Sequence, residues 1–372
     1  MLLAPLVAPI VDRTVGLTGD QIGGTQTYLA DLADRLAGRQ HAVTLLAAPG
    51  SRVASVETVE LPIGHLGLVP ATFDRPSPRA DLAAQAEAFA IARDWLRANA
   101  TRIDVVHAHA FDAPAFTSLR RLVRPVVHTL HLPPLDAGVV AAAAAVAGEA
   151  TLTTNSAANA AAWRAAGVPI REVVPYGLDV EALPFGAGGR YLLFAGRLTP
   201  EKGADLAIDV AAALGRPLLL VGGVYDRGFY ERAVRPRVRE RPGWAPGDRV
   251  EPGATYVGPR ARAGVFELMA GAEGLLMPVR WDEPLGLVGI EAPAVGCPVV
   301  AFARGGLAEV VVDGETGWRV RPGDIDAFLA ATRRLPEIDR HRARASVARR
   351  YGVEAMVEGY VRVYQRAMAG RA

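Results

Sequence analysis

Short apolar runs alternate with amphipathic helical stretches along the chain, and this alternation limits the folds that it can adopt. Six of the runs are apolar on successive residues, not on every second residue, as parallel strands covered on both faces are. They occupy residues 104–110, 125–131, 191–196, 217–223, 274–279 and 298–303. Strands that alternate with helices in this way predict βαβ units, and therefore an α/β protein with doubly wound parallel sheets.

Residues 25–39 illustrate the helical pattern. One predicted face is apolar and the other is polar. The apolar face carries Leu29, Leu32, Ala33 and Leu36, and the polar face carries Asp31, Asp34 and Arg35. A second amphipathic helix is predicted at the C-terminal end, over residues 353–370.

A chain of 372 residues is long for one compact core, and two domains are expected. The βα pattern pauses at residues 183–190, a stretch rich in proline and glycine, and then restarts with a new strand. We therefore predict one Rossmann-like domain over residues 1–186 with 355–372, and a second over residues 187–354. The two are expected to face each other across a cleft.

The net charge and the cysteine content limit which partners the protein is expected to bind and in which cellular compartment it is expected to lie. A net charge of +2 does not indicate that the protein binds nucleic acid or a strongly anionic membrane surface. The single cysteine, Cys297, cannot form an internal disulfide and suits a reducing compartment, so a cytoplasmic location is predicted. The alanine-rich run at 138–148 is too short to cross a bilayer, and no transmembrane segment is expected. Composition does not indicate an oligomeric state.

A glycine pair precedes the first predicted helix. Gly23 and Gly24, followed by Thr25, would let a ligand approach the backbone at a helix N-terminus, although such a turn alone is weak evidence. The stretch is not the dinucleotide GxGxxG, and no acidic residue closely follows the second strand. These departures argue against a nicotinamide-dependent dehydrogenase.

Two cations follow the strand at 191–196. Arg197 and Lys202 lie in the predicted loop between that strand and a helix beginning near Gly203. Two cations at the carboxyl end of a parallel sheet suit a diphosphate. Either residue alone would be read as a solvated side chain, but their position in the first loop of the second domain favours a functional role.

Two glutamates stand in the apolar stretch RWDEPLGLVGIEAPAVGCPVV, residues 280–300. A helix is predicted from about Leu285. It places Glu283 at the N-terminus of the helix, near the free backbone amides of Gly286 and Leu287. Glu291 lies on that helix, where its carboxylate could accept both hydroxyls of a vicinal diol. The alternative is that Glu291 is half-exposed, or paired with an arginine from another helix.

Histidines occur in the pairs His107/His109 and His128/His131. The spacing resembles a metal site, but no cysteine or carboxylate cluster completes a ligand set, so no metal is predicted. Most of these histidines are expected to be satisfied in the core, while His131, at a strand end, is the best candidate for substrate contact. Asp324, before an apolar helix, is expected to be an N-cap.

Together these stretches resemble the retaining glycosyltransferases of family 4, which have the GT-B fold. The resemblance covers essentially the whole chain. It includes GGTQTYLADL, DVVHAHA, VVPYGLDVEAL and FAGRLTPEKGAD, and the paired glutamates with the first in EP-x-G. It implies a hexosyltransferase (EC 2.4) that moves a sugar from a nucleoside-diphosphate sugar to a hydroxyl group of a small metabolite, glycan or lipid. The sugar, base and acceptor are not specified.

The resemblance also implies roles for individual residues. In the catalytic set, Arg197 and Lys202 would hold the donor diphosphate, Glu283 would contact the donor sugar, and His131 would lie beside that sugar. The second domain would bind the donor and the first the acceptor. The implied donor-binding set is Glu291 at the ribose, Leu285, Gly286 and Leu287 at the sugar, Val257 and Gly258 at the base, and Gly24. Gly23, Gly24 and Thr25 would form the acceptor-side loop.

The family generally needs no bound metal and no other cofactor. A lipid acceptor would place the enzyme peripherally at the membrane. The chain departs from the family at Leu285, where phenylalanine is frequent, and at Pro293, which predicts a kink just after Glu291. The rival interpretations are a nucleotide-sugar epimerase of the same fold and a non-catalytic nucleotide-sugar-binding protein.

Overall fold

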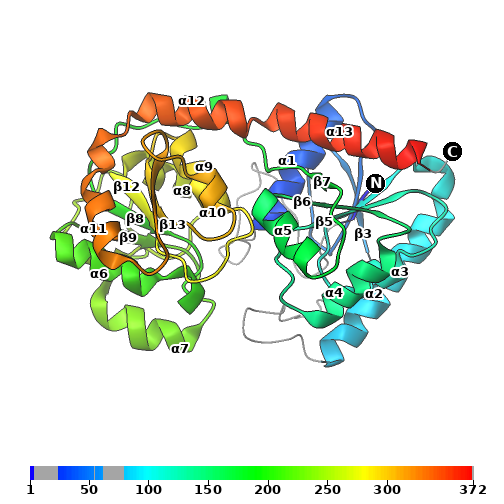
Figure 1. Ribbon diagram of the computed structural model, residues 1–372, viewed down its shortest axis with the longest axis horizontal. Coiled ribbons are helices and arrows are strands. Elements are labelled where there is room, and N and C mark those ends of the chain that lie inside the picture. The colour runs from blue at the N-terminus through cyan, green and yellow to red at the C-terminus, as the bar shows by residue number, and fades with distance from the viewer. Residues whose placement is uncertain (4–23, 54, 62–78, 371–372) are drawn as a thin grey trace. The chain divides into compact units, whose positions relative to one another are not determined.

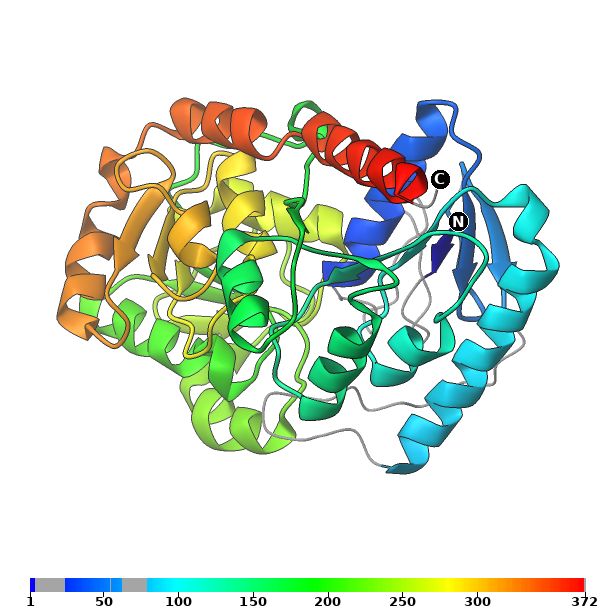
Figure 2. The same cartoon turned by 45° about the vertical axis from the view of Figure 1, so that its right-hand side comes forward.

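The computed structural model of the protein describes residues 1–3, 24–53, 55–61 and 79–370. Contacts divide this part of the chain into two compact units. The first holds the described residues 1–3, 24–53, 55–61, 79–176 and 354–370, and the second holds residues 177–353. Figures 1 and 2 show a mixed α/β ribbon in both.

Residues 177–186 belong to the second unit, although the predicted boundary placed them in the first domain. Backbone pairing explains this difference, because the Leu178 amide donates to the Tyr351 carbonyl at 2.7 Å. The Arg344 guanidinium also donates to the carbonyl of Leu183 at 3.2 Å. A proline- and glycine-rich stretch without periodicity can therefore still be fixed to one unit.

The first unit is built on a seven-stranded parallel sheet in the order β3-β2-β1-β4-β5-β6-β7. Its strands are β1 (Leu2–Leu3), β2 (Thr44–Ala47), β3 (Glu57–Glu60), β4 (Val106–Ala108), β5 (Val126–Leu130), β6 (Thr151–Thr154) and β7 (Glu172–Val173). Its helices are α1 (Gly24–Gly38), α2 (Arg79–Ala98), η1 (Ala100–Arg102), α3 (Ala113–Ser118), α4 (Ala137–Val146), α5 (Ala157–Ala165) and α13 (Val353–Ala369). The strand order is that of a Rossmann-type sheet.

The predicted apolar face of helix α1 is confirmed, since Leu29, Leu32 and Ala33 are fully buried. The prediction for Asp31 was wrong, because this residue is buried and not on the polar face. Its carboxylate accepts a hydrogen bond from the Tyr176 hydroxyl at 2.6 Å, which compensates for burial of the polar group. The partner lies 145 residues away in the chain.

The second unit contains another seven-stranded parallel sheet, in the order β10-β11-β9-β8-β12-β13-β14. Its strands are β8 (Leu192–Ala195), β9 (Leu218–Val221), β10 (Val238–Glu240), β11 (Ala254–Tyr256), β12 (Gly274–Met277), β13 (Val299–Phe302) and β14 (Gly317–Val320). The six apolar runs that were predicted as strands are confirmed, because each contains one strand of the structure: β4, β5, β8, β9, β12 or β13.

Helices cover both faces of the second sheet (Figure 1). On one face α6 (Ala204–Leu214) and α11 (Ile325–Arg333) pack together over a core that includes Phe302 and Phe328. On the other, α8 (Arg262–Gly271), α9 (Leu287–Ala294) and α12 (Arg340–Arg350) pack together. The remaining elements are η2 (Val180–Ala182), η3 (Pro200–Lys202), α7 (Arg227–Phe229), η4 (Tyr230–Val234), η5 (Arg235–Arg237), α10 (Leu307–Val310) and η6 (Leu335–Glu337). Asp324 caps α11 as predicted, accepting from the Ala327 amide.

Candidate functional site

The order of the second sheet reverses between β8 and β12, which are neighbouring parallel strands. Ligands of open α/β sheets bind outside the carboxyl ends of the strands at such a switch point. The loop after β8 carries Arg197 and Lys202, and the loop after β12 carries Glu283. A backbone hydrogen bond of 2.8 Å from the Arg280 amide to the Glu201 carbonyl ties the two loops together.

Lys202 and Glu283 meet where these loops join. The Lys202 Nζ donates to Glu283 Oε2 at 2.6 Å, and the two side chains are only 18% and 11% exposed. The same carboxylate oxygen accepts from Trp281 Nε1 at 2.7 Å, and Lys202 Nζ lies 4.8 Å from the centre of the Trp281 ring. The largely buried carboxylate that the sequence left without a partner is therefore held by a cation and an indole.

Glycines allow the loops to approach each other this closely. Gly203 follows Lys202 with φ +76°, and a Cβ added there would lie 2.2 Å from the Pro278 carbonyl oxygen. A Cβ on Gly306 would lie 2.5 Å from the Leu285 Cα. Both are backbone contacts, so a side chain would displace the loops that present Lys202 and Glu283.

Substitution of Gly203 tests this packing. We expect Gly203→Ala to lower the free energy of unfolding by more than the roughly 1–2 kcal/mol that a left-handed alanine costs by itself. Gly215→Ala is the matched control, because Gly215 has φ +63° and no described residue lies within 4 Å of an added Cβ. Thermal unfolding compares the two variants. Equal losses would contradict the importance of the contact with Pro278.

Arg197 lies on the same loop but contacts different groups. Its Nη2 is 3.3 Å from Glu201 Oε1, and its guanidinium lies 5.7 Å from the centre of the Tyr225 ring. The side chain is 36% exposed, twice the value for Lys202. The loop therefore presents one partly exposed cation and one held against a carboxylate.

Glu291 lies on α9 and is paired with an arginine from another helix, which is the alternative that the sequence left open. Its Oε1 accepts from the Arg262 guanidinium of α8 at 3.2 Å and 3.0 Å, with side-chain exposures of 12% and 14%. The bond involves Oε1 alone. Helix α9 begins at Leu287, later than predicted, after Gly286 in the left-handed conformation at φ +84°.

Pro293, where a kink was predicted, lies in the last turn of α9, which ends at Ala294, so the helix does not continue past the proline. The chain leaves the helix through a bond from the Cys297 amide to the Ala292 carbonyl at 2.8 Å. A proline so close to the helix end disturbs little, and Glu291 remains in regular helix.

The residues predicted at the base follow β11. Val257 is fully buried, and Gly258 has φ +77°. A Cβ on Gly258 would lie 3.6 Å from Pro242 Cβ, so the segment after β10 packs against this loop. Leu285, predicted at the sugar, is buried at 3% exposure.

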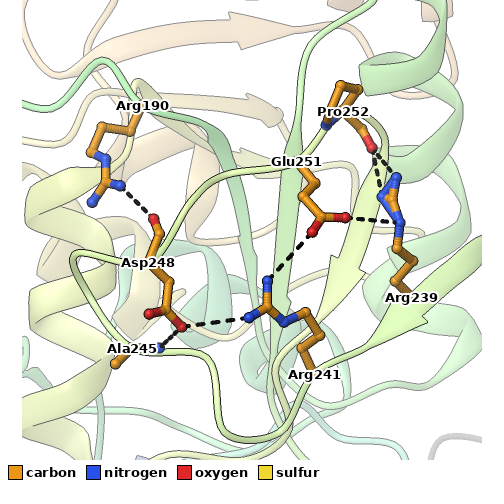
Figure 3. Close-up of polar contacts among 7 residues, drawn as sticks. All are labelled: Arg190, Arg239, Arg241, Ala245, Asp248, Glu251 and Pro252. Carbon is orange, nitrogen blue, oxygen red and sulfur yellow. Dashed lines mark hydrogen bonds and ion pairs between the residues drawn. The ribbon is translucent and has the colours of Figure 1, made fainter.

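Ionic contacts hold the segment between β10 and β11 (Figure 3). The Arg241 guanidinium lies between Glu251, at 3.6 Å, and Asp248, at 3.8 Å. Asp248 also accepts from the Ala245 amide at 3.0 Å, which closes a turn. Exposed pairs of this kind contribute about 0–1 kcal/mol each, so we interpret them as loop support and not as a ligand site.

Three of the predicted site residues belong to the first unit: His131, Gly24 and Thr25. Gly24 begins α1, and Thr25 follows it. Gly23 lies outside the described residues. His131 follows β5 and is 6% exposed, and its Nε2 lies 3.0 Å from Nδ1 of His109.

The other histidines differ in how well they are satisfied. His107 bonds to the Tyr364 hydroxyl and to the Thr129 hydroxyl, each at 2.7 Å. In the described part of the chain, His109 Nε2 and His128 Nδ1 are buried without a hydrogen-bond partner, so the predicted satisfaction holds only in part. Across the described ranges, no group of three His, Cys, Asp or Glu side chains is placed to hold a metal ion.

Several contributors at the second unit's switch point had been missed. Trp281, Glu201 and Arg262 contact the predicted residues directly. Trp281 and Glu201 stand within the quoted motifs, so proximity in sequence was an available signal. Arg262 is 29 residues from Glu291, and nothing in the sequence indicates their pairing.

Comparison with known proteins agrees with this architecture. Residues 22–182 match the family described as Glycosyltransferase Family 4, and residues 189–337 match Glycosyl transferases group 1. Sucrose-phosphate synthase from Thermosynechococcus elongatus has a similar structure, with a TM-score of 0.76, 21% identity and coverage of 99% of both chains. Anabaena HepE in complex with UDP-glucose gives a TM-score of 0.67 at 19% identity, covering 98% of this chain and 99% of that one. The fold is therefore GT-B.

Proteins that are similar in sequence indicate the class of enzyme to which this chain belongs. A D-inositol 3-phosphate glycosyltransferase of Kribbella flavida is 29% identical over 84% of this chain and 82% of its own length. A glycogen synthase of Mycobacterium tuberculosis is 31% identical over 47% of this chain and 42% of its own. The chain belongs to the family 4 type of glycosyltransferases and is an enzyme of the EC 2.4 class. None of the described helices has the length and apolar character needed to cross a membrane.

Proposed function

We propose that this glycosyltransferase moves a sugar from a nucleoside-diphosphate sugar to an acceptor hydroxyl, with retention of anomeric configuration and without a bound metal ion. The observation that carries the proposal is the cluster of Lys202, Glu283 and Trp281 at the switch point of the second sheet. Such a cluster combines a cation for a leaving diphosphate with a carboxylate that can accept from sugar hydroxyls.

The charge movement of the reaction explains the two cations. The bond between the sugar's anomeric carbon and the diphosphate oxygen breaks, and negative charge builds on that oxygen. Lys202 and Arg197 would stabilise it by charge-assisted hydrogen bonds. The acceptor oxygen bonds to the anomeric carbon on the same face, and its proton passes to the leaving phosphate. The products are a glycoside and a nucleoside diphosphate.

Glu283 would contact a hydroxyl of the donor sugar while Lys202 and Trp281 hold its carboxylate. Glu291 would accept from the ribose diol, with Arg262 fixing its other oxygen. Both glutamates then act by orientation and not as nucleophiles. A cytoplasmic location suits the single cysteine, Cys297, whose buried thiol has its pKa raised to about 12 by burial.

Release of nucleoside diphosphate tests the proposal. The names of the relatives suggest D-inositol 3-phosphate as the first acceptor, and the HepE complex suggests UDP-glucose as the first donor, followed by guanosine and adenosine diphosphate sugars. We expect release only when donor and acceptor are both present, undiminished by EDTA, with proton NMR showing an α-linked product from an α-linked donor.

Three results would contradict parts of this proposal. Equal release without acceptor would indicate hydrolysis, and loss of release with EDTA would remove metal independence. Donor binding by calorimetry without release, for every pair tested, would favour a non-catalytic binding protein.

Substitution of Glu291 tests the ribose assignment. We expect Glu291→Gln to weaken donor binding about 10-fold or more, because a hydrogen bond to a charged carboxylate is lost. Calorimetry with the donor that the wild type binds measures this. Glu273→Gln is the matched control, since Glu273 pairs with Arg216 and its side chain is 20% exposed. Glu273 directly precedes β12 and so lies at the amino ends of the strands, away from the loops of the candidate site. Unchanged affinity of Glu291→Gln would exclude it from the ribose site.

A further inference from the structure

Two buried histidines meet at the carboxyl edge of the first unit's sheet. His109 follows β4 and His131 follows β5, and these strands are neighbours in register, with Ala108 opposite His128. The His109 Nδ1 lies 3.0 Å from the His131 Nε2, and the ring planes are inclined by only 24°. His109 is fully buried and His131 is 6% exposed.

Both rings are neutral at pH 7. Burial lowers the pKa of His131 to about 3. It also lowers the pKa of His109 well below 6.5, and the nearby His107 and His131 add to this effect. A neutral imidazole carries one proton, so one ring of the pair donates and the other accepts.

The surroundings of His109 decide which ring donates. Its Nε2 is buried and has no hydrogen-bond partner among the residues that the structure describes. If His131 donated, the proton of His109 would have to sit on this Nε2, as a buried N–H group without an acceptor. Among backbone groups, buried N–H donors without an acceptor are rarer than under-satisfied carbonyl acceptors, and we apply the same preference to the ring N–H. Donation from His109 Nδ1 avoids this arrangement.

The ring of His109 is held in this orientation by its neighbours. The His107 ring centre lies 3.9 Å from that of His109, and both His107 nitrogens are bonded, to Tyr364 and Thr129. The Tyr28 ring packs against both members of the pair, at 5.9 Å from His109 and 5.0 Å from His131. Rotation of the His109 ring would therefore disturb a packed aromatic cluster.

We propose that His109 is a positioning residue that fixes His131 in the tautomer with its proton on Nδ1. Within the described part of the chain this Nδ1 makes no hydrogen bond, but unlike His109 Nε2 it is not among the fully buried atoms, so its N–H can reach water or a ligand. His131 then offers an N–H donor to an oxygen of the bound sugar, and has no free lone pair with which to act as a base. The inference rests on the proposed function, together with the position beside the donor sugar that the family resemblance implies for His131.

Nitrogen NMR of the wild-type protein tests the tautomer directly. Protein labelled with ¹⁵N-histidine, recorded at pH 7, is expected to show His131 protonated at Nδ1 and unprotonated at Nε2, with His131→Gln used to assign the signals. A proton on Nε2 of His131 would overturn the proposal. The result does not depend on any variant of His109 being folded.

Two variants of His109 then test the effect on catalysis. His109→Leu removes the donor and is expected to lower kcat about 10-fold or more, as loss of a partner that orients a functional histidine does. His109→Asn keeps an N–H group near the position of Nδ1 and is expected to retain most of the activity. His128→Leu is the control, because His128 is buried on β5 and stacks on Phe116, outside the pair.

The outcomes distinguish the positioning role of His109 from the proposed function of the protein. If His109→Leu matches the wild type in kcat, or loses no more than His128→Leu, the positioning role is wrong. If the wild type transfers no sugar from any donor, the proposed function is wrong, while the NMR result still decides the tautomer.

Discussion

Replacing Lys202 with alanine is expected to lower kcat/KM about 10²–10³-fold, the loss typical when one group that stabilises developing negative charge is removed. Lys202 Nζ is the cation that binds Glu283 at 2.6 Å at the switch point of the second sheet. Without it, the charge that builds on the leaving diphosphate would be stabilised by Arg197 alone among the predicted residues. Steady-state release of nucleoside diphosphate measures the loss.

The same substitution is expected to affect stability as well, because Glu283 is only 11% exposed and would lose its cation. Leaving such a group with fewer partners costs about 1–3 kcal/mol. Reduced thermal stability would therefore not show that Lys202 is merely structural. The double variant Lys202→Ala with Glu283→Gln removes the unpaired charge, and is expected to recover stability but not activity.

Arg216→Ala provides a matched control in the same unit. Arg216 pairs with Glu273, at exposures of 29% and 20%, away from the loops that follow β8 and β12. It should lose stability and keep kcat/KM. Recovery of activity together with stability in the double variant would instead mean that Lys202 acts only by supporting the fold.

The strands were predictable from sequence because parallel strands buried on both faces are apolar throughout. The runs containing Leu192–Ala195 and Val299–Phe302 show this, since nearly all their residues are buried. Helix α1 was predictable for the related reason that one of its faces covers a sheet. Asp31 was mispredicted because its compensating partner, Tyr176, is distant in sequence. A periodic pattern reports average burial and cannot identify a polar residue satisfied by a long-range contact.

In the candidate site, too, some features were predictable from the sequence and others were not. The loops with Arg197, Lys202 and Glu283 were located from motifs that follow strands, and the structure brings Lys202 and Glu283 into contact across 81 residues of sequence. The pairing itself was not predictable, because it depends on which strands are neighbours in the sheet. For Glu291, sequence left two alternatives open, and only the position of α8 beside α9 identified Arg262 as its partner.

Acidification from pH 7 to pH 5 is expected to destabilise the first unit by about 3 kcal/mol or more, chiefly through its buried histidines. Burial lowers the pKa of His128 and of His131 from 6.5 to about 3, so both stay neutral in the folded protein at pH 5. In the unfolded chain they bind protons below pH 6.5. The unfolded state therefore gains about 2 kcal/mol per histidine over this interval, and stability falls as pH falls.

His107 and His109 act in the same direction, since burial lowers the pKa of each well below 6.5. Asp112 opposes them. Burial raises the pKa of its carboxyl from 3.8 to about 6, so the folded state binds a proton that the unfolded state does not bind until lower pH. This contribution stabilises the fold by about 1 kcal/mol at pH 5 and disappears as pH rises above 6. Four histidines outweigh one aspartate, and the net effect is acid destabilisation.

Denaturant unfolding at pH 7 and pH 5 measures the difference, and two variants identify its source. His128→Leu removes one buried histidine whose Nδ1 has no hydrogen-bond partner among the described residues, and should reduce the loss between the two pH values by about 2 kcal/mol. His41→Gln changes an exposed histidine of the same unit and should leave the loss unchanged. If His128→Leu retains the full pH dependence, the buried histidines do not cause it, because removing one proton-binding group from the unfolded state must otherwise flatten the curve.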